Sequence, residues 1–142
     1  MIILAVDYGD VRTGIAVCDK FEMLASPVCV ITQTDSEKLI YEIKEIAIKH
    51  KADEIVVGLP KNMDSSLGSR AQKCTEFADA LSAATGIKCV MRDERLSTVS
   101  AHNALNATNT RGKKRKAVVD QVAAVMILQD YIDYRKLNGL NS

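Results

Sequence analysis

The sequence lacks several features that would place a protein outside the soluble, single-domain class. None of its apolar runs approaches the ~20 residues of a membrane span. The apolar run at the amino end has no basic segment before it and is interrupted by Asp7, which is unlike a signal peptide. No proline- or glycine-rich linker divides the 142 residues. We therefore expect a soluble, cytoplasmic protein with no membrane association, folded as a single domain over residues 1–142.

Paired cysteines and an excess of one charge are also missing. The four cysteines lie far apart, and none forms a C-x-x-C pair, which argues against a zinc site or a disulfide framework; they are Cys18, Cys29, Cys74 and Cys89. We expect them to be reduced thiols of the core. The 19 basic and 18 acidic side chains leave a net charge of +1, so any contact with nucleic acid must come from a local basic cluster.

The apolar patterning predicts an α/β domain with a mixed sheet. Short apolar runs predict strands at 2–6, 14–18, 28–31, 54–60 and 88–92. Apolar residues at helical spacing predict a helix after a cap at Asp35, a helix over 69–85 that ends at Gly86, a short helix near 99–105 and a last helix over about 116–135. The segments 61–68 and 106–114 carry no such pattern, and we expect loops there.

Asp7 stands at the end of the first apolar run, directly before the turn Tyr8–Gly14. An aspartate after a strand is often a turn former that accepts hydrogen bonds from nearby amides, and this interpretation remains open. The alternative is a metal ligand, because hard divalent cations prefer carboxylate oxygens. The choice depends on whether other acids converge on Asp7.

Two further positions are candidates for such acids. Asp93 and Glu94 follow the strand 88–92, and because adjacent strand residues point to opposite faces, only one of them is expected to face Asp7; both could instead be solvated. Asp120 lies on an otherwise apolar helical stripe, where a carboxylate is costly unless it is paired or bound to a metal. Its alternative partners are Arg92 and Arg95.

Three separated carboxylates are typical of a two-metal site that cleaves phosphodiesters. Oxygen-only ligands favour Mg²⁺ or Mn²⁺ over zinc. A basic run precedes the last helix and could grip a phosphate backbone, although such a run is often a solvated loop. The candidate nucleic-acid-binding residues are Arg111, Lys113, Lys114, Arg115 and Lys116, with Arg12 and Arg70 as possible additions.

Four strings of residues resemble, in order, the motifs of the YqgF/RuvX family of Holliday junction resolvases. They are Val6–Gly9 with Arg12–Ala16, then Val57–Asp64, Asp93–Thr98 and Val119–Ala124. The resemblance covers nearly the whole chain and implies an RNase H-like fold, with a central mixed sheet flanked by helices. It also implies Asp7, Glu94 and Asp120 as catalytic and metal-binding acids, with Asp93 the less certain member of its pair. Ser65 and Cys18 depart from the residues usual in the family, glycine and serine respectively.

The function implied by this resemblance is a divalent-metal nuclease that acts on structured nucleic acid. The expected substrate is the precursor of 16S ribosomal RNA, cleaved near its 5′ end. Branched DNA, cleaved by a Holliday junction resolvase, is the alternative. A binding module without turnover is a further possibility, whereas an actin-like ATPase would need a second lobe that 142 residues cannot supply. The partner is therefore structured RNA or branched DNA, and the chain could act as a monomer or a homodimer.

Overall fold

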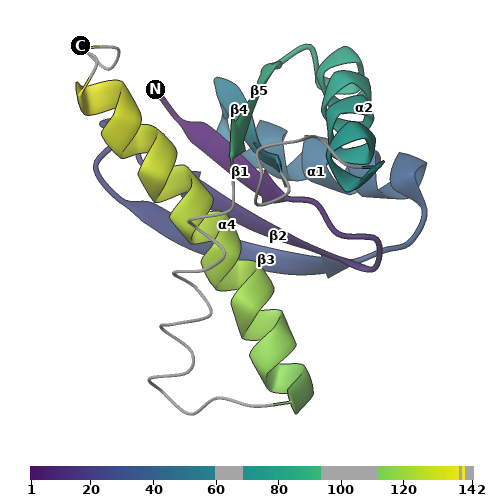
Figure 1. Cartoon of the computed structure of the whole chain (residues 1–142). Coiled ribbons are helices and arrows are strands. Elements are labelled where there is room, and N and C mark those ends of the chain that lie inside the picture. Colours follow the sequence, from purple (N-terminus) through teal and green to yellow (C-terminus); the bar gives the residue numbers. More distant parts are fainter. Residues whose placement is uncertain (60–68, 94–111, 138, 140–142) are drawn as a thin grey trace.

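The computed structural model describes residues 1–59, 69–93, 112–137 and 139, with the backbone alone at 59, 69–70, 93 and 112–121. The elements in this part of the chain form a five-stranded sheet and three helices (Figure 1). In chain order they are β1 (Ile3–Asp7), β2 (Arg12–Cys18), β3 (Ala25–Thr32), α1 (Ser36–His50), β4 (Glu54–Leu59), α2 (Ser69–Thr85), β5 (Lys88–Asp93) and α4 (Gly112–Leu137).

The strand order in the sheet is β3-β2-β1-β4-β5. The first three strands form antiparallel pairs, whereas β1, β4 and β5 are parallel neighbours. The mixed sheet expected from the sequence is thereby confirmed. Since parallel strands end at the same edge, the carboxyl ends of β1, β4 and β5 lie together, and the start of β2 lies beside them.

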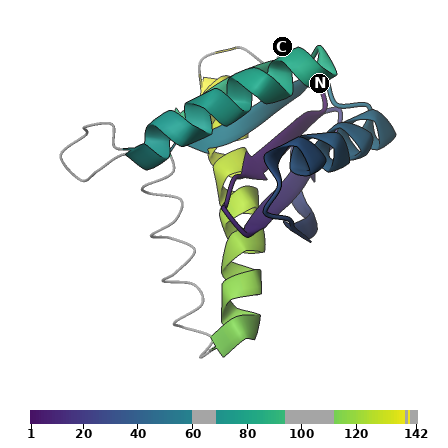
Figure 2. The same ribbon diagram turned by 90° about the vertical axis from the view of Figure 1, so that its right-hand side faces the viewer.

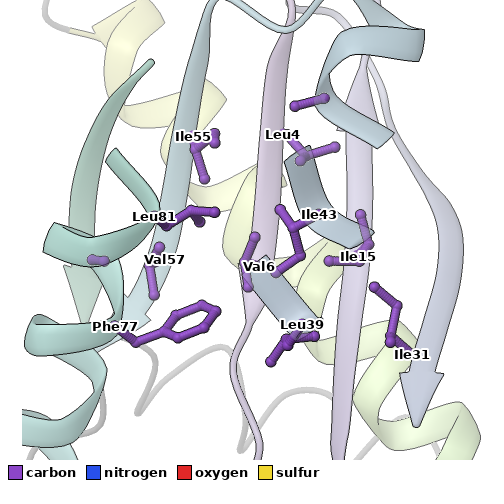
Figure 3. Packing of buried hydrophobic residues seen from close by; sticks show 12 residues of the cluster. Leu4, Val6, Ile15, Ile31, Leu39, Ile43, Ile55, Val57, Phe77 and Leu81 are labelled. Atoms are coloured by element: carbon purple, nitrogen blue, oxygen red, sulfur yellow. The ribbon is translucent and has the colours of Figure 1, made fainter. Parts of the chain in front are cut away.

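The helices cover the two faces of the sheet unequally. Helices α1 and α2 lie on one face, while α4 crosses the other face obliquely and extends past it with its first turns (Figures 1 and 2). The core under α1 and α2 contains Leu4, Val6, Ile15, Leu39, Ile43, Val57, Phe77 and Leu81, which interlock in Figure 3. The core under α4 contains Ile3, Ala5, Ala16, Val56, Ala124, Ile127, Leu128 and Ile132.

Local capping explains where α1 begins and where α2 ends. The Asp35 side chain accepts hydrogen bonds from the amides of Glu37 and Lys38, which opens α1 as expected. Helix α2 ends before Gly86, whose positive φ of 72° suits a residue without a Cβ. The helix expected over 69–85 is confirmed at both ends.

The structure corrects three boundaries. Strand β2 begins at Arg12, not at Gly14, so the turn after Asp7 is shorter than expected. Helix α4 begins at Gly112, not near Lys116, so Lys113–Lys116 are helical and not part of a loop. Strand β3 begins at Ala25, before Pro27, because an edge strand tolerates a proline that cannot donate to a ladder. The expected loop at 61–68 and short helix at 99–105 lie outside the described residues.

The structure also bears on the membrane and on the thiols. None of the helices in the described ranges is long and apolar enough to cross a membrane.

All four cysteines are free thiols, with Cys18 and Cys74 buried and Cys29 and Cys89 half-buried. Burial raises the pKa of Cys89 to about 11, so this thiol stays protonated at neutral pH.

Candidate active site

Asp7 occupies the last position of β1 and is half-buried. Side chains alternate along this strand: Ile3 and Ala5 belong to the core under α4, whereas Leu4 and Val6 belong to the core under α1 and α2. The same alternation assigns Asp7 to the face covered by α4. The acid is therefore presented at the carboxyl edge of the sheet, on the side of the helix that carries Asp120.

Both strand neighbours of Asp7 are glycines. Gly14 of β2 is its direct partner in the antiparallel ladder. On the other side Val6 pairs with Val57, and continuing the parallel register by one residue places Gly58 beside Asp7. Directly opposed residues share a face, so no neighbouring strand side chain crowds the carboxylate from either side. Sequence reasoning did not single out these glycines for this role, although a glycine inside a strand pattern is a signal of close approach.

A tight turn holds the end of β1. A Cβ added to Gly9 would lie 1.9 Å from the Arg12 carbonyl oxygen, so only glycine fits there. The buried Thr13 hydroxyl accepts a hydrogen bond from the Gly9 amide at 3.3 Å and lies 3.4 Å from its carbonyl oxygen. The turn after Asp7 is thus fixed by steric fit and by a buried side chain.

The same turn is attached to α2 on the opposite face. Tyr8 stacks on Phe77, with ring centroids 4.1 Å apart and planes 14° from parallel. Asp10 accepts a hydrogen bond from Lys73 Nζ at 2.7 Å. These contacts hold the residues that follow the candidate acid against α2.

Asp120 lies within α4, whose backbone is helical from Gly112 onward. Ala124 follows one turn later and Ile127 follows after two, and both are buried against the sheet. Helical periodicity therefore puts position 120 on the stripe of α4 that faces the sheet.

The sequence suggested Arg92 as an alternative partner of Asp120, but the structure shows Arg92 bonded to other residues of α4. Its Nε donates to Asp130 Oδ2 at 2.7 Å, and its guanidinium carbon lies 4.5 Å from the ring centroid of Tyr134. Both contacts are with α4, at positions ten and fourteen residues after Asp120. At the end of the same strand the Asp93 backbone pairs with Leu59, and Glu94 and Arg95 lie outside the described residues.

The candidate basic residues fall into three groups. Arg12 begins β2, pairs with Thr32 and lies at the sheet edge that carries Asp7. Lys113, Lys114, Arg115 and Lys116 occupy the first turns of α4, and Arg70 the first turn of α2, as backbone positions. Arg111 lies outside the described residues. Within the part of the chain whose side chains are described, no group of three or more potential metal ligands comes together.

The fold defines the structural class. A Thermus thermophilus RuvC bound to a Holliday junction substrate matches with a TM-score of 0.60 over 96% of both chains at 12% identity. The fowlpox virus Holliday junction resolvase matches with a TM-score of 0.54 over 94% of this chain and 99% of that one, at 13% identity. The protein therefore has the RNase H-like fold of the RuvC-like resolvases, as expected from its motifs.

The sequence comparisons then give the family. The family model described as "RuvX: Holliday junction resolvase" matches residues 1–134. A Halothermothrix orenii protein named "Putative pre-16S rRNA nuclease" is 45% identical over 140 residues, which cover 98% of this chain and 100% of that one. An Agathobacter rectalis protein of the same name is 40% identical, covering 94% and 96%. The chain belongs to the RuvX family.

Proposed function

We propose that this protein is a divalent-metal nuclease that cleaves phosphodiester bonds in structured nucleic acid. The observation that carries the proposal is the placement of Asp7 at the carboxyl edge of the sheet, between two glycines and on the face covered by α4. Position 120 on the sheet-facing stripe of α4 supports it. Together with Glu94, these acids would form the catalytic centre of a single domain within residues 1–142.

The donor set suits a hard cation. The candidate ligands Asp7, Glu94 and Asp120 are all carboxylates, and oxygen ligands favour Mg²⁺ or Mn²⁺. When bound, such ions supply an activated water and charge neutralisation for the leaving oxygen. Because Gly14 and Gly58 carry no side chains, neither strand neighbour of Asp7 would obstruct a scissile phosphate beside it.

The basic residues would position the nucleic acid. Arg12 lies at the same sheet edge as Asp7, and the run Lys113–Lys116 begins the helix that carries Asp120. Cations there would neutralise backbone phosphates and orient the strand toward the acids, with Arg70 and Arg111 as further contacts.

The proposed substrate is the precursor of 16S ribosomal RNA, because relatives that are 40–45% identical carry the name "Putative pre-16S rRNA nuclease". Cleavage near the 5′ end of this RNA, in the cytoplasm, is a further part of the proposal. Branched DNA is the second candidate, since the family model is described by Holliday junction resolution. The chain could act on either as a monomer or as a homodimer.

The test is cleavage of an RNA spanning the 5′ end of the 16S precursor and of a four-way DNA junction, each with Mg²⁺ and with Mn²⁺. We expect Asp7→Asn to lower the rate by at least about 100-fold, because groups that only support a metal ligand already contribute 10- to 100-fold. Asp10→Asn is the matched control and should retain activity, since Asp10 pairs with Lys73 on the other side of the turn.

Two results would contradict the proposal. Undiminished cleavage by Asp7→Asn would remove Asp7 from the centre. Tight, salt-sensitive binding of either substrate, without cleavage in any divalent metal, would instead identify a binding module.

A further inference from the structure

We propose that Arg92 is a positioning residue, which fixes the acid-bearing helix α4 against the acid-bearing end of β5. The inference rests on the proposed nuclease function, because it concerns how Glu94 and Asp120 are brought to Asp7. Arg92 itself is not assigned a contact with the substrate or a metal.

The register places Arg92 at the level of the site. Gly58 pairs with Arg92 across the parallel β4–β5 ladder, and Gly58 is also the residue beside Asp7. Asp7, Gly58 and Arg92 thus form one row across three strands, about 10 Å long at the usual strand spacing. Arg92 precedes Glu94 by two residues, so it marks the end of β5 that leads to the second acid.

The contacts of Arg92 then join this strand end to α4. Its Nε donates to Asp130 at 2.7 Å, while its guanidinium packs over the Tyr134 ring at 4.5 Å. Asp130 follows Asp120 by ten residues of continuous helix, roughly 15 Å along the axis. Because a helix moves as a rigid rod over this length, holding Asp130 also limits axial sliding at Asp120.

Such a link matters because α4 packs chiefly against β2, β3 and β1. Strand β5 is one of the two edge strands of the described sheet, and its hydrogen-bonded neighbour there is β4. Metal coordination by Glu94, which follows β5, and by Asp120 of α4 would require their relative placement to within a few tenths of an ångström. A charged hydrogen bond directly between the two elements supplies that constraint.

The ion pair is also suited to positioning more than to stability. The side chains of Arg92 and Asp130 are 29% and 47% exposed to solvent. Exposed ion pairs of this kind contribute little to the free energy of folding. Loss of the pair should therefore appear in catalysis and metal binding before it appears in the melting temperature.

The experiment compares Arg92→Ala, Asp130→Ala and the double variant with wild type. The readouts are kcat and KM for cleavage, Tm, and the Mn²⁺ concentration that gives half of the maximal thermal shift. We expect each single variant to lower kcat by about two- to fivefold, the range that loss of an exposed ion pair allows, to require more Mn²⁺ for the same thermal shift and to change KM and Tm little. The double variant should be no worse than Arg92→Ala, because Asp130 acts through its bond to Arg92.

Asp133→Ala is the matched control. Asp133 lies one turn after Asp130 on α4 but accepts its hydrogen bond from Gln129 of the same helix, so its loss should leave all readouts unchanged. The inference is wrong if Arg92→Ala keeps the wild-type kcat and Mn²⁺ response, if Asp130→Ala does not share its defect, or if Asp133→Ala is equally impaired. Absence of both cleavage and an Mn²⁺ shift in wild type would instead refute the proposed function itself.

Discussion

Asp7 lies directly opposite Gly14 in the antiparallel ladder between β1 and β2. Gly14 therefore places no side chain on that side of the carboxylate. We expect Gly14→Ala to reduce cleavage about tenfold, because a Cβ about 5 Å from that of Asp7 would occupy space needed for the phosphate or a metal. Steady-state kinetics with varied Mn²⁺ will measure this effect.

Folding of the same variant provides the control for Gly14→Ala. Alanine is no worse than glycine in a strand, and overpacking by one methyl group typically costs roughly 1–3 kcal/mol. A folded variant with unchanged kinetics would show that the space beside Asp7 has no role in the reaction.

The stacked rings of Tyr8 and Phe77 give a second prediction. Tyr8 follows Asp7 and anchors the strand end to α2, and Phe77 is 5% exposed. We expect Phe77→Leu and Tyr8→Leu each to destabilise the fold, with a coupling energy of about 0.5–1.5 kcal/mol between them. Urea unfolding of the four members of the double-mutant cycle measures the coupling. Strict additivity would mean that the rings do not act as a pair.

Much of the fold follows from the local sequence, but the long-range contacts do not. The continuous apolar run over residues 2–6 indicated a strand. The alternation of side chains along that strand, seen in the structure, then assigns Asp7 to one face. The start of α4 was misplaced because Lys113–Lys116 lack apolar periodicity, although lysine and arginine are good helix formers. The site itself also depends on pairings between residues far apart in the chain, such as Arg92 with Asp130 or Val6 with Val57, which no local spacing encodes.

The buried hydrogen bond from Tyr131 to Glu54 predicts a loss of stability at alkaline pH. Burial, followed by the bond to Glu54, raises the pKa of Tyr131 to about 12, above the value of about 10 in an unfolded chain. A raised pKa means that the folded state favours the neutral phenol. Its stabilising contribution is therefore complete below pH 10 and is lost as the pH rises from about 10 to about 12.

Tyr131→Phe is the control for this pH dependence. It removes the titrating group, so its free energy of unfolding should fall less steeply than that of wild type above pH 10. At neutral pH the variant should be less stable by about 1–3 kcal/mol, because Glu54, which is 6% exposed, loses this donor. If the free energies of unfolding of the two proteins fall equally steeply above pH 10, the assignment of the titration to Tyr131 is wrong.

The ion pair between Arg135 and Glu22 joins the end of α4 to the loop between β2 and β3. Arg135 Nε donates to Glu22 Oε1 at 2.5 Å, and Glu22 is 3% exposed. The backbone of Glu22 is in the left-handed region, with φ of 54°, so the ion pair holds a conformation that glutamate rarely adopts. We expect Arg135→Gln to cost about 3 kcal/mol, because it leaves a buried carboxylate with less compensation.

Chemical unfolding of a second variant separates charge from packing at this site. The amino group of Met1 lies 3.3 Å from Glu22 Oε2 and remains as a weaker partner in Arg135→Gln. In that background Glu22→Gln should recover part of the lost stability, because an amide can be buried without a counterion. Glu22 follows the carboxyl end of β2, whereas Asp7 pairs near the start of that strand. The rate of cleavage per folded molecule should therefore be the same in both variants as in wild type. If the second substitution destabilises the protein further, the cost of Arg135→Gln arises from lost packing and not from an uncompensated charge.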